Sequence, residues 1–112
     1  MAPGGRRVAF LGDMLELGDQ APQLHSEVGA LAARAGINRL YATGEHAANV
    51  AHGARKEGLQ AAETVTGSHD EIIVDLKKIL QPDDWVLVKG SRGMAMEKVV
   101  RKLQKWAGEK KS

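Results

Sequence analysis

Two short segments of the chain carry the residue types that could bind an anionic ligand. In the first, KGSRG at 89–93, the cations Lys89 and Arg92 lie among two glycines and Ser91. Glycine lets the backbone approach a ligand closely, and free amides at the start of a helix favour an anion. Arg92 can hold a carboxylate or phosphate through two parallel hydrogen bonds, and Lys89 adds a point charge. The segment therefore predicts an anion site made by Lys89, Gly90, Ser91 and Arg92; the alternative is a capped turn with solvated cations.

The second segment, GDMLELG at 12–18, offers carboxylates in place of cations. Asp13 can accept hydrogen bonds from hydroxyl or ammonium groups, or pair with a cation of the first segment, and Glu16 can do the same. The alternative for Asp13 is a loop carboxylate satisfied by its own surroundings. We expect Gly12, Asp13 and Glu16 to belong to one binding site together with His25, which either hydrogen-bonds back to the loop or contacts the ligand.

The composition excludes several other kinds of chemistry. The chain has no cysteine, which rules out disulfides, thiolate metal sites and cysteine nucleophiles. Neither G-x-G-x-x-G nor G-x-x-x-x-G-K-[ST] occurs, and no serine can be tied to a histidine as a nucleophile and base. A net charge of +2 and an aromatic content of 4% argue against nucleic-acid binding. Because the histidines show no metal-binding spacing, we expect neither catalytic residues nor a metal site in this chain.

The length and hydropathy of the chain predict one water-soluble unit. No apolar run approaches the roughly 20 residues of a membrane span, and no secretory signal opens the sequence. We therefore expect a cytoplasmic protein that does not bind membranes. The 112 residues fit a single domain over 1–106, followed by a charged tail at 107–112.

Stretches of strand and helix character alternate along the chain and would position the two segments. Short apolar or β-branched runs bounded by turn residues predict four strands, at 8–11, 39–43, 63–66 and 85–88. Apolar residues at helical spacing predict a helix after each strand. The first begins near Pro22, the second spans 46–57, and the third opens at a capping box of Ser68 and Glu71. The last helix would present an apolar face of Met96, Val99, Val100, Leu103 and Trp106.

Four βα units in succession predict an α/β fold of the Rossmann-like kind. Strands joined through helices run parallel, with helices on both faces of the sheet, so the chain should form a three-layer α/β/α sandwich. We expect the strand order 3-2-1-4, in which the order reverses between the first and the last strand. Ligands bind beyond the carboxyl ends of the strands at such a reversal. The segments 12–18 and 89–93 both leave the sheet there and should frame one crevice.

The segments VAFLGDMLELG, HSEVG from His25 and VLVKGSRGMAMEKVV together resemble the C-terminal domain of the Mur ligase family. The resemblance runs from about Arg6 to Leu103. It implies an ATP-dependent ligase that forms an amide bond in peptidoglycan precursor synthesis. More narrowly, the chain is similar to the member of the family that joins D-alanyl-D-alanine to UDP-N-acetylmuramoyl-tripeptide. The domain would act as a mobile lid, with Asp13 on the nucleotide or the dipeptide amine and Lys89, Ser91 and Arg92 on the dipeptide carboxylate or a phosphate.

The resemblance also implies what this chain lacks. In the family, ATP and Mg²⁺ are held mainly by a central domain, so the isolated chain should bind no cofactor and ligate nothing. The family's domain begins with a further strand, which makes this chain an N-terminally truncated version and residues 85–88 an apolar edge. We expect self-association through that edge, or its coverage by residues 1–7 or by the tail. The alternative function is a free-standing α/β module for ligand binding or regulation.

Overall fold

The computed structural model describes residues 6–14, 18–81, 83–90, 101 and 104–105. Its elements are, in order, β1 (Arg7–Leu11), η1 (Gly18–Gln20), α1 (Ala21–Arg34), β2 (Arg39–Ala42), α2 (Ala47–Lys56), η2 (Ala61–Glu63), β3 (Thr64–Thr66), α3 (His69–Ile79) and β4 (Trp85–Lys89). The four predicted strands are confirmed, each end within one residue of its expected place. The helix predicted after Gly93 and the tail at 107–112 lie outside the described residues.

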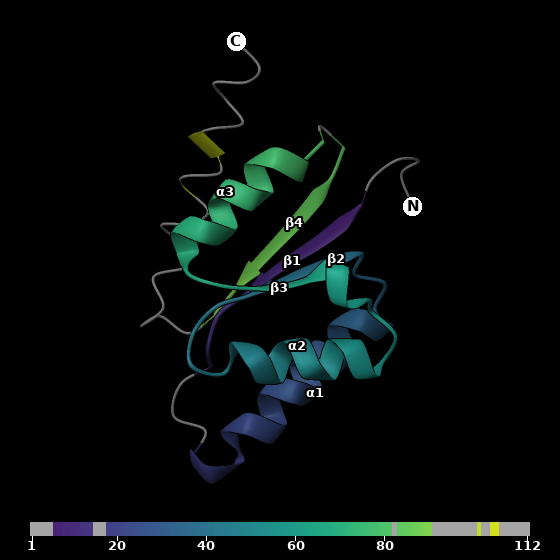
Figure 1. Cartoon of the computed structure of the whole chain (residues 1–112), viewed down its shortest axis with the longest axis vertical. Coiled ribbons are helices and arrows are strands. Elements are labelled where there is room, and N and C mark those ends of the chain that lie inside the picture. The colour runs from purple at the N-terminus through teal and green to yellow at the C-terminus, as the bar shows by residue number, and fades with distance from the viewer. Residues whose placement is uncertain (1–5, 15–17, 82, 91–100, 102–103, 106–112) are drawn as a thin grey trace.

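The four strands form one parallel sheet with the order β3-β2-β1-β4, as predicted (Figure 1). The first strand lies inside the sheet, because β2 pairs with one of its edges and β4 with the other. Its register sets Leu11 beside Ala42 of β2 and beside Lys89 of β4. The carboxyl ends of these three strands therefore meet at one edge of the sheet.

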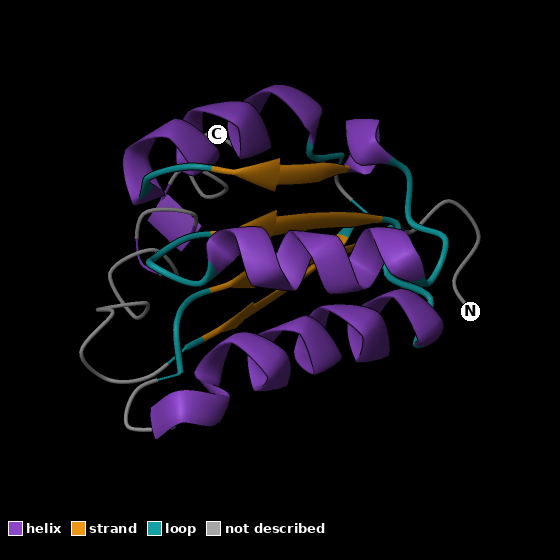
Figure 2. Ribbon diagram, turned by 60° about the horizontal axis from the view of Figure 1, so that its bottom comes forward, coloured by secondary structure: helices purple, strands orange, loops and turns teal. Residues whose placement is uncertain are grey.

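Helices cover both faces of the sheet, which gives the expected three layers (Figure 2). Successive side chains of a strand point to opposite faces, and β1 is apolar on both. Val8 and Phe10 pack under α3 with Tyr41, Ile72 and Leu76. On the other face, a second core cluster lies beneath α1 and α2 and contains Ala9, Leu11, Leu40, Ala42, Ala47, Val50 and Ala54.

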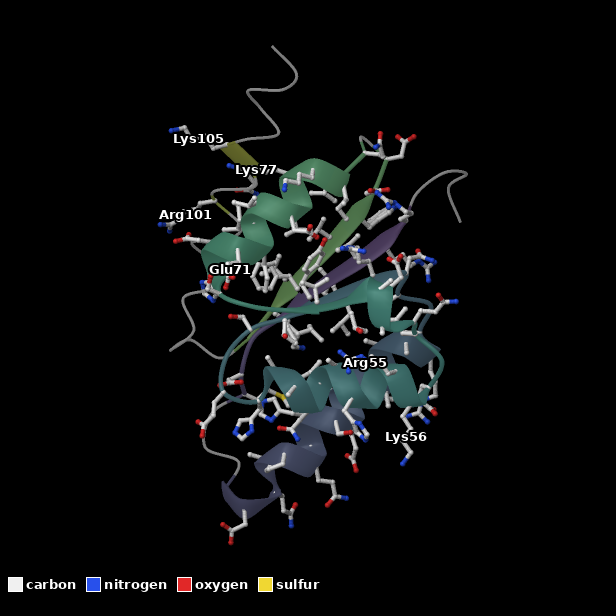
Figure 3. All side chains as sticks on the ribbon, viewed as in Figure 1. Arg55, Lys56, Glu71, Lys77, Arg101 and Lys105 are labelled. Carbon is white, nitrogen blue, oxygen red and sulfur yellow. The ribbon has the colours of Figure 1, made fainter. Side chains whose placement is uncertain are left out.

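The capping box predicted for α3 is present. The Ser68 hydroxyl accepts a hydrogen bond from the Glu71 amide, and the Glu71 carboxylate accepts one from the Ser68 amide. These hydrogen bonds lower the pKa of the fully exposed Glu71 carboxyl. Figure 3 shows Glu71 at the start of α3. The box therefore sets the point at which the third helix begins, above the core face that Phe10 contributes.

An ion pair at the opposite edge of the sheet secures the start of β4 against β1. The Arg6 guanidinium donates to the Asp84 carboxylate at 2.8 Å, and the Arg6 amide donates to the same group at 3.1 Å. Burial by itself raises the pKa of the Asp84 carboxyl, but hydrogen bonds from Arg6 and from the Gln81 amide bring that pKa below its usual value. The Trp85 amide then donates to the Arg6 carbonyl and continues the pairing into the strands.

Strand β4 is an outer strand of the described sheet and is covered on one face only. Val86 and Val88 pack against the core cluster under α3. On the other face Trp85 is 67% exposed and Leu87 is 54% exposed. These two side chains line a shallow apolar groove together with Arg7, Val8 and Ile37. The apolar edge that the sequence predicts at 85–88 is therefore present in the described part of the chain.

Two glycines let α1 and α2 cross at very short range. A Cβ atom added to Gly29 in α1 would lie 1.9 Å from the Val50 carbonyl oxygen, and one added to Gly53 in α2 would lie 1.8 Å from the Ser26 carbonyl oxygen. Real Cβ atoms do not approach backbone atoms so closely. The two helices thus pack backbone to backbone, which keeps the start of α2 and the second turn of α1 next to the ends of β1 and β2.

Replacing Gly53 by alanine tests this contact. Helix propensity alone would make the variant more stable by about 1 kcal/mol. Because the new methyl group overlaps the Ser26 carbonyl, we expect the free energy of unfolding to fall by about 1–3 kcal/mol instead. Urea denaturation measures the change. Ala48→Gly, at an exposed position of α2, reports the propensity effect alone; a Gly53→Ala variant more stable than the wild type would contradict the close crossing.

Candidate functional site

The two predicted segments leave the sheet side by side. Leu11 and Lys89 are register partners, and one residue further along the chain the Gly12 amide donates to the Lys89 carbonyl at 2.8 Å. The Lys89 side chain is exposed at this edge and Gly90 is half-buried. Glu16, Ser91 and Arg92 lie outside the described residues. The structure therefore confirms that β1 and β4 deliver both segments to one edge, with a cation and an exposed strand end on the β4 side.

Asp13 faces the turn between β2 and α2. One of its carboxylate oxygens accepts a hydrogen bond from the Glu45 amide at 2.8 Å, and the other accepts one from the His46 amide at 2.9 Å. The residue is only 6% exposed. Its carboxylate makes no ion pair with Lys89, the described cation of the neighbouring segment. The structure thus shows the second of the two alternatives for Asp13, a loop carboxylate whose hydrogen bonds are made by its own surroundings.

Asp13 supplies what the start of α2 lacks locally. The N-cap of α2 is His46, whose side chain makes no capping hydrogen bond. The first amides of a helix have no partner within the helix, and the positive end of the helix dipole favours a negative group. Asp13 meets both needs from a different strand. Gly44 makes room for it, because a Cβ there would lie 2.5 Å from the Asp13 carboxyl carbon and the backbone has a φ of +104°.

His25 joins α1 to the same loop. The imidazole is 1% exposed, its Nδ1 lies 2.6 Å from the Ala21 carbonyl oxygen, and its Nε2 lies 2.9 Å from the Met14 amide nitrogen. A backbone amide can only donate, so Nε2 is the acceptor and Nδ1 carries the proton. The expected hydrogen bond from His25 back to the loop is therefore present, and the buried ring is neutral in this arrangement.

The neutral ring explains two nearby contacts. Nε2 of His25 lies 3.9 Å from an Asp13 carboxylate oxygen. This contact is not an ion pair, since the Nε2 lone pair already accepts the Met14 amide. On its other side the His25 ring stacks on His46, with ring centres 4.5 Å apart and an angle of 27° between the planes. Asp13, His25 and His46 thus form a compact cluster that ties the ends of β1 and β2 to the first turns of both helices.

Sequence reasoning identified Asp13 and His25 but missed their partners. Gly44, Glu45 and His46 come from the turn after β2, which carries no charge pattern that suggests a site. The sequence feature that could have pointed to these partners is a missing helix cap. The segment TGEH before α2 has no Ser, Thr, Asp or Asn at the position that caps a helix. A helix without a local cap needs an acceptor from elsewhere in the fold.

Among the described residues, the site offers groups that could bind a ligand and no group arranged for a chemical reaction. Within the described ranges, no three His, Cys, Asp or Glu side chains are grouped so that they could hold a metal ion. No helix in that part of the chain is long and apolar enough to cross a membrane. What the described edge presents is the Lys89 ammonium and the half-buried backbone of Gly90, while the buried Gly12 joins the two segments through its amide. This arrangement suits the binding of an anionic group.

The role of Asp13 can be tested by its removal. Asp13→Ala leaves the Glu45 and His46 amides without their acceptor, so we expect the free energy of unfolding to fall by about 1–3 kcal/mol. Chemical denaturation gives the value, and Asp19→Ala, at an exposed acidic position, is the matched control. Unchanged stability would contradict this supporting role and leave Asp13 available to a ligand.

Comparison with known proteins relates this arrangement to one family. The sequence pattern described as "Mur ligase, glutamate ligase domain" matches residues 1–92. A UDP-N-acetylmuramoyl-tripeptide–D-alanyl-D-alanine ligase of Bacillus subtilis is 33% identical over 99 residues, covering 88% of this chain and 22% of that protein. The ligase of the same name from Escherichia coli is 36% identical over 102 residues, covering 89% of this chain and 21% of that protein.

Solved structures show the same fold. MurF from Acinetobacter baumannii superposes with a TM-score of 0.74 at 27% identity, over 90% of this chain and 22% of that one. MurF ligase from Thermotoga maritima, in complex with ADP, gives a TM-score of 0.73 at 22% identity, over 95% of this chain and 23% of that one. The chain thus spans about a fifth of the length of the proteins it matches. From the matched sequence pattern, the relatives and the shared sheet, the chain belongs to the Mur ligase family and corresponds to its C-terminal, glutamate ligase domain.

Proposed function

We propose that this domain is the substrate-binding lid of an ATP-dependent ligase that joins D-alanyl-D-alanine to UDP-N-acetylmuramoyl-tripeptide in the cytoplasm. Relatives that carry this activity in their names are 33% and 36% identical to the chain. The observation that carries the proposal is the hydrogen bond between the Gly12 amide and the Lys89 carbonyl at 2.8 Å. It brings the two characteristic segments to one edge, where a lid would close on its substrate.

The proposal divides the site residues by what each can do. Lys89, Ser91 and Arg92 stabilise the dipeptide carboxylate or a phosphate, because cations and a hydroxyl donor favour an anion. Gly90 allows the ligand to approach the backbone closely, and the buried Gly12 holds the two segments together through its amide. The buried Asp13 supports the loop from behind through the amides of the β2–α2 turn. Glu16, in the same loop, is then the carboxylate that accepts hydrogen bonds from the dipeptide ammonium group.

ATP and Mg²⁺ are assigned to the rest of the ligase. The chain has no G-x-x-x-x-G-K-[ST] segment, and its described acidic and histidine residues form no group that suits a metal ion. These residues do not fit a resident nucleotide–metal site. What this domain adds on closure is the charge of Lys89 and Arg92 near the acid group that ATP activates.

A hybrid enzyme tests the proposed function. The corresponding domain of the Escherichia coli relative is replaced by this chain, and phosphate release is measured as a function of D-alanyl-D-alanine. We expect ATP-dependent ligation, and we expect Arg92→Ala to raise the dipeptide KM about tenfold or more, as loss of a charged hydrogen bond would. Lys77→Ala removes an exposed cation from α3 and should leave KM unchanged (Figure 3).

The outcomes separate the rival functions. An unchanged KM in the Arg92→Ala hybrid would remove Arg92 from substrate binding. A folded hybrid without ligation would contradict the lid assignment. Binding of a different small anion by the chain alone would then favour the alternative, a free-standing α/β ligand-binding or regulatory module.

We also propose that the isolated chain self-associates through β4. An antiparallel pairing of two β4 strands about Leu87 would place Leu87 against Leu87 and Val86 against Val88. It would also set Trp85 opposite Lys89 of the second copy, and a cation over an indole ring is attractive. The exposed face of β4 that carries Trp85 and Leu87 would then continue into the same face of the second copy. Each apolar side chain of the strand, and Lys89, would then face a compatible side chain of the second copy.

Sedimentation of the isolated chain checks this second proposal. We expect a concentration-dependent dimer that Leu87→Lys abolishes, because a charge in the edge strand blocks pairing. Leu31→Lys is the control, since Leu31 is a 58% exposed leucine on α1. A monomer at all concentrations would rule out the second copy. Slow amide exchange along 85–88 in such a monomer would show that residues 1–7 or the tail cover the strand.

A further inference from the structure

His25 is the point at which α1 contacts the loop that leaves β1. Ala21, His25 and Gly29 are the buried residues of α1 and recur every four positions, so they form one inward stripe along the helix. Gly29 of this stripe packs against the backbone of α2. His25, one turn earlier, reaches the Met14 amide at 2.9 Å, directly after Asp13. The contact between the two helices and the position of the loop therefore depend on the same face of α1.

The imidazole is held so that only one protonation state fits. The Ala21 carbonyl at 2.6 Å requires a proton on Nδ1, and the Met14 amide requires a lone pair on Nε2. The titratable groups that contact the ring are the Asp13 carboxylate, from the end of β1, and the His46 imidazole, from the turn before α2. A buried ring with both nitrogens in use has no free group to offer a ligand, which removes His25 from direct substrate contact.

We propose that neutral His25 is a positioning residue that latches the loop after β1 by accepting the Met14 amide, and that protonation of the ring releases the latch. The consequence for ligation rests on the proposed function, whereas the latch itself does not. By holding Met14, His25 fixes the backbone directly after Asp13, where the chain leaves β1. A backbone that is already held before a ligand arrives lowers the entropic cost of binding.

Protonation would exchange one hydrogen bond for another. With a second proton, Nε2 becomes a donor and can no longer accept the Met14 amide. The nearest acceptor is the Asp13 oxygen 3.9 Å away, which already accepts the His46 amide. Turning the ring towards Asp13 therefore frees Met14 and competes with the cap of α2. The latch is therefore closed while the ring is neutral and opens when Nε2 takes up a proton.

Nuclear magnetic resonance of the isolated chain tests the latch directly. In the wild type at neutral pH, we expect the ring nitrogens of His25 to show the tautomer protonated on Nδ1. The protection factor of the Met14 amide, its exchange rate relative to an unstructured peptide at the same pH, should fall about tenfold once His25 is protonated, as expected for loss of one hydrogen bond. An Nε2-protonated tautomer, or a Met14 protection factor that protonation of His25 leaves unchanged, would overturn the proposal.

Two substitutions separate positioning from folding. His25→Leu removes the acceptor, and we expect fast Met14 exchange at every pH. His25→Gln retains an acceptor without a titrating group, so Met14 should stay protected at low pH. His52→Gln, an exposed histidine of α2, should behave as the wild type. If His25→Leu does not fold, the wild-type titration and His25→Gln still decide the proposal; a Met14 protection factor that falls with pH in His25→Gln as it does in the wild type would overturn it.

The hybrid ligase provides a functional readout. His25→Leu should raise the dipeptide KM about tenfold with kcat little changed, because the loop is released but no reacting group is lost. His25→Gln should restore KM and flatten its dependence on pH. A fall in kcat without a change in KM would overturn the positioning role. A hybrid that never ligates, in which Met14 still follows His25 titration, would contradict the proposed function and leave the latch standing.

Discussion

Parallel pairing of the first strand with the last determines which residues of this chain meet. β1 is joined to β2 on one side and to β4 on the other, and it is buried on both faces. The register places Leu11 beside Lys89. It therefore brings the segments that begin at Gly12 and Lys89, which start 77 residues apart (89 − 12), to one edge of the sheet. An Arg6–Asp84 ion pair fixes the start of the same pairing at the far edge. A shift of one residue would turn every side chain of β4 to the other face and separate the two segments.

At the carboxyl edge of the sheet, backbone amides and a buried carboxylate provide each other's hydrogen-bond partners. Helix α2 begins without a local cap, and β1 ends in a carboxylate that burial would otherwise penalise. Placing Asp13 on the amides of Glu45 and His46 satisfies both at once. His25 does the same for the Met14 amide. The described side chains of this cluster are therefore inward-facing support for the end of β1 and the start of α2.

The two faces of the sheet differ in how completely they are covered. On one face α3 packs over β1, β2 and the inner side chains of β4. On the other, α1 and α2 are drawn together by Gly29 and Gly53 and lie over β1 and β2. Among the described residues, Trp85 and Leu87 of β4 remain exposed on this face, and they line an apolar groove beside Ile37.

The sequence by itself determined the elements and their order, because apolar periodicity, glycine at helix ends and the Ser68 capping box are local signals. The order 3-2-1-4 followed from general rules for parallel sheets, and it placed Gly12 next to Lys89 correctly. Only the tertiary structure decided that Asp13 turns to the β2–α2 turn and that His25 accepts the Met14 amide. Both choices depend on Gly44 and His46, which reach the cluster from another strand. A hydrogen bond between distant segments leaves no periodic trace in the chain, so its partner becomes visible only when the sheet brings the two together.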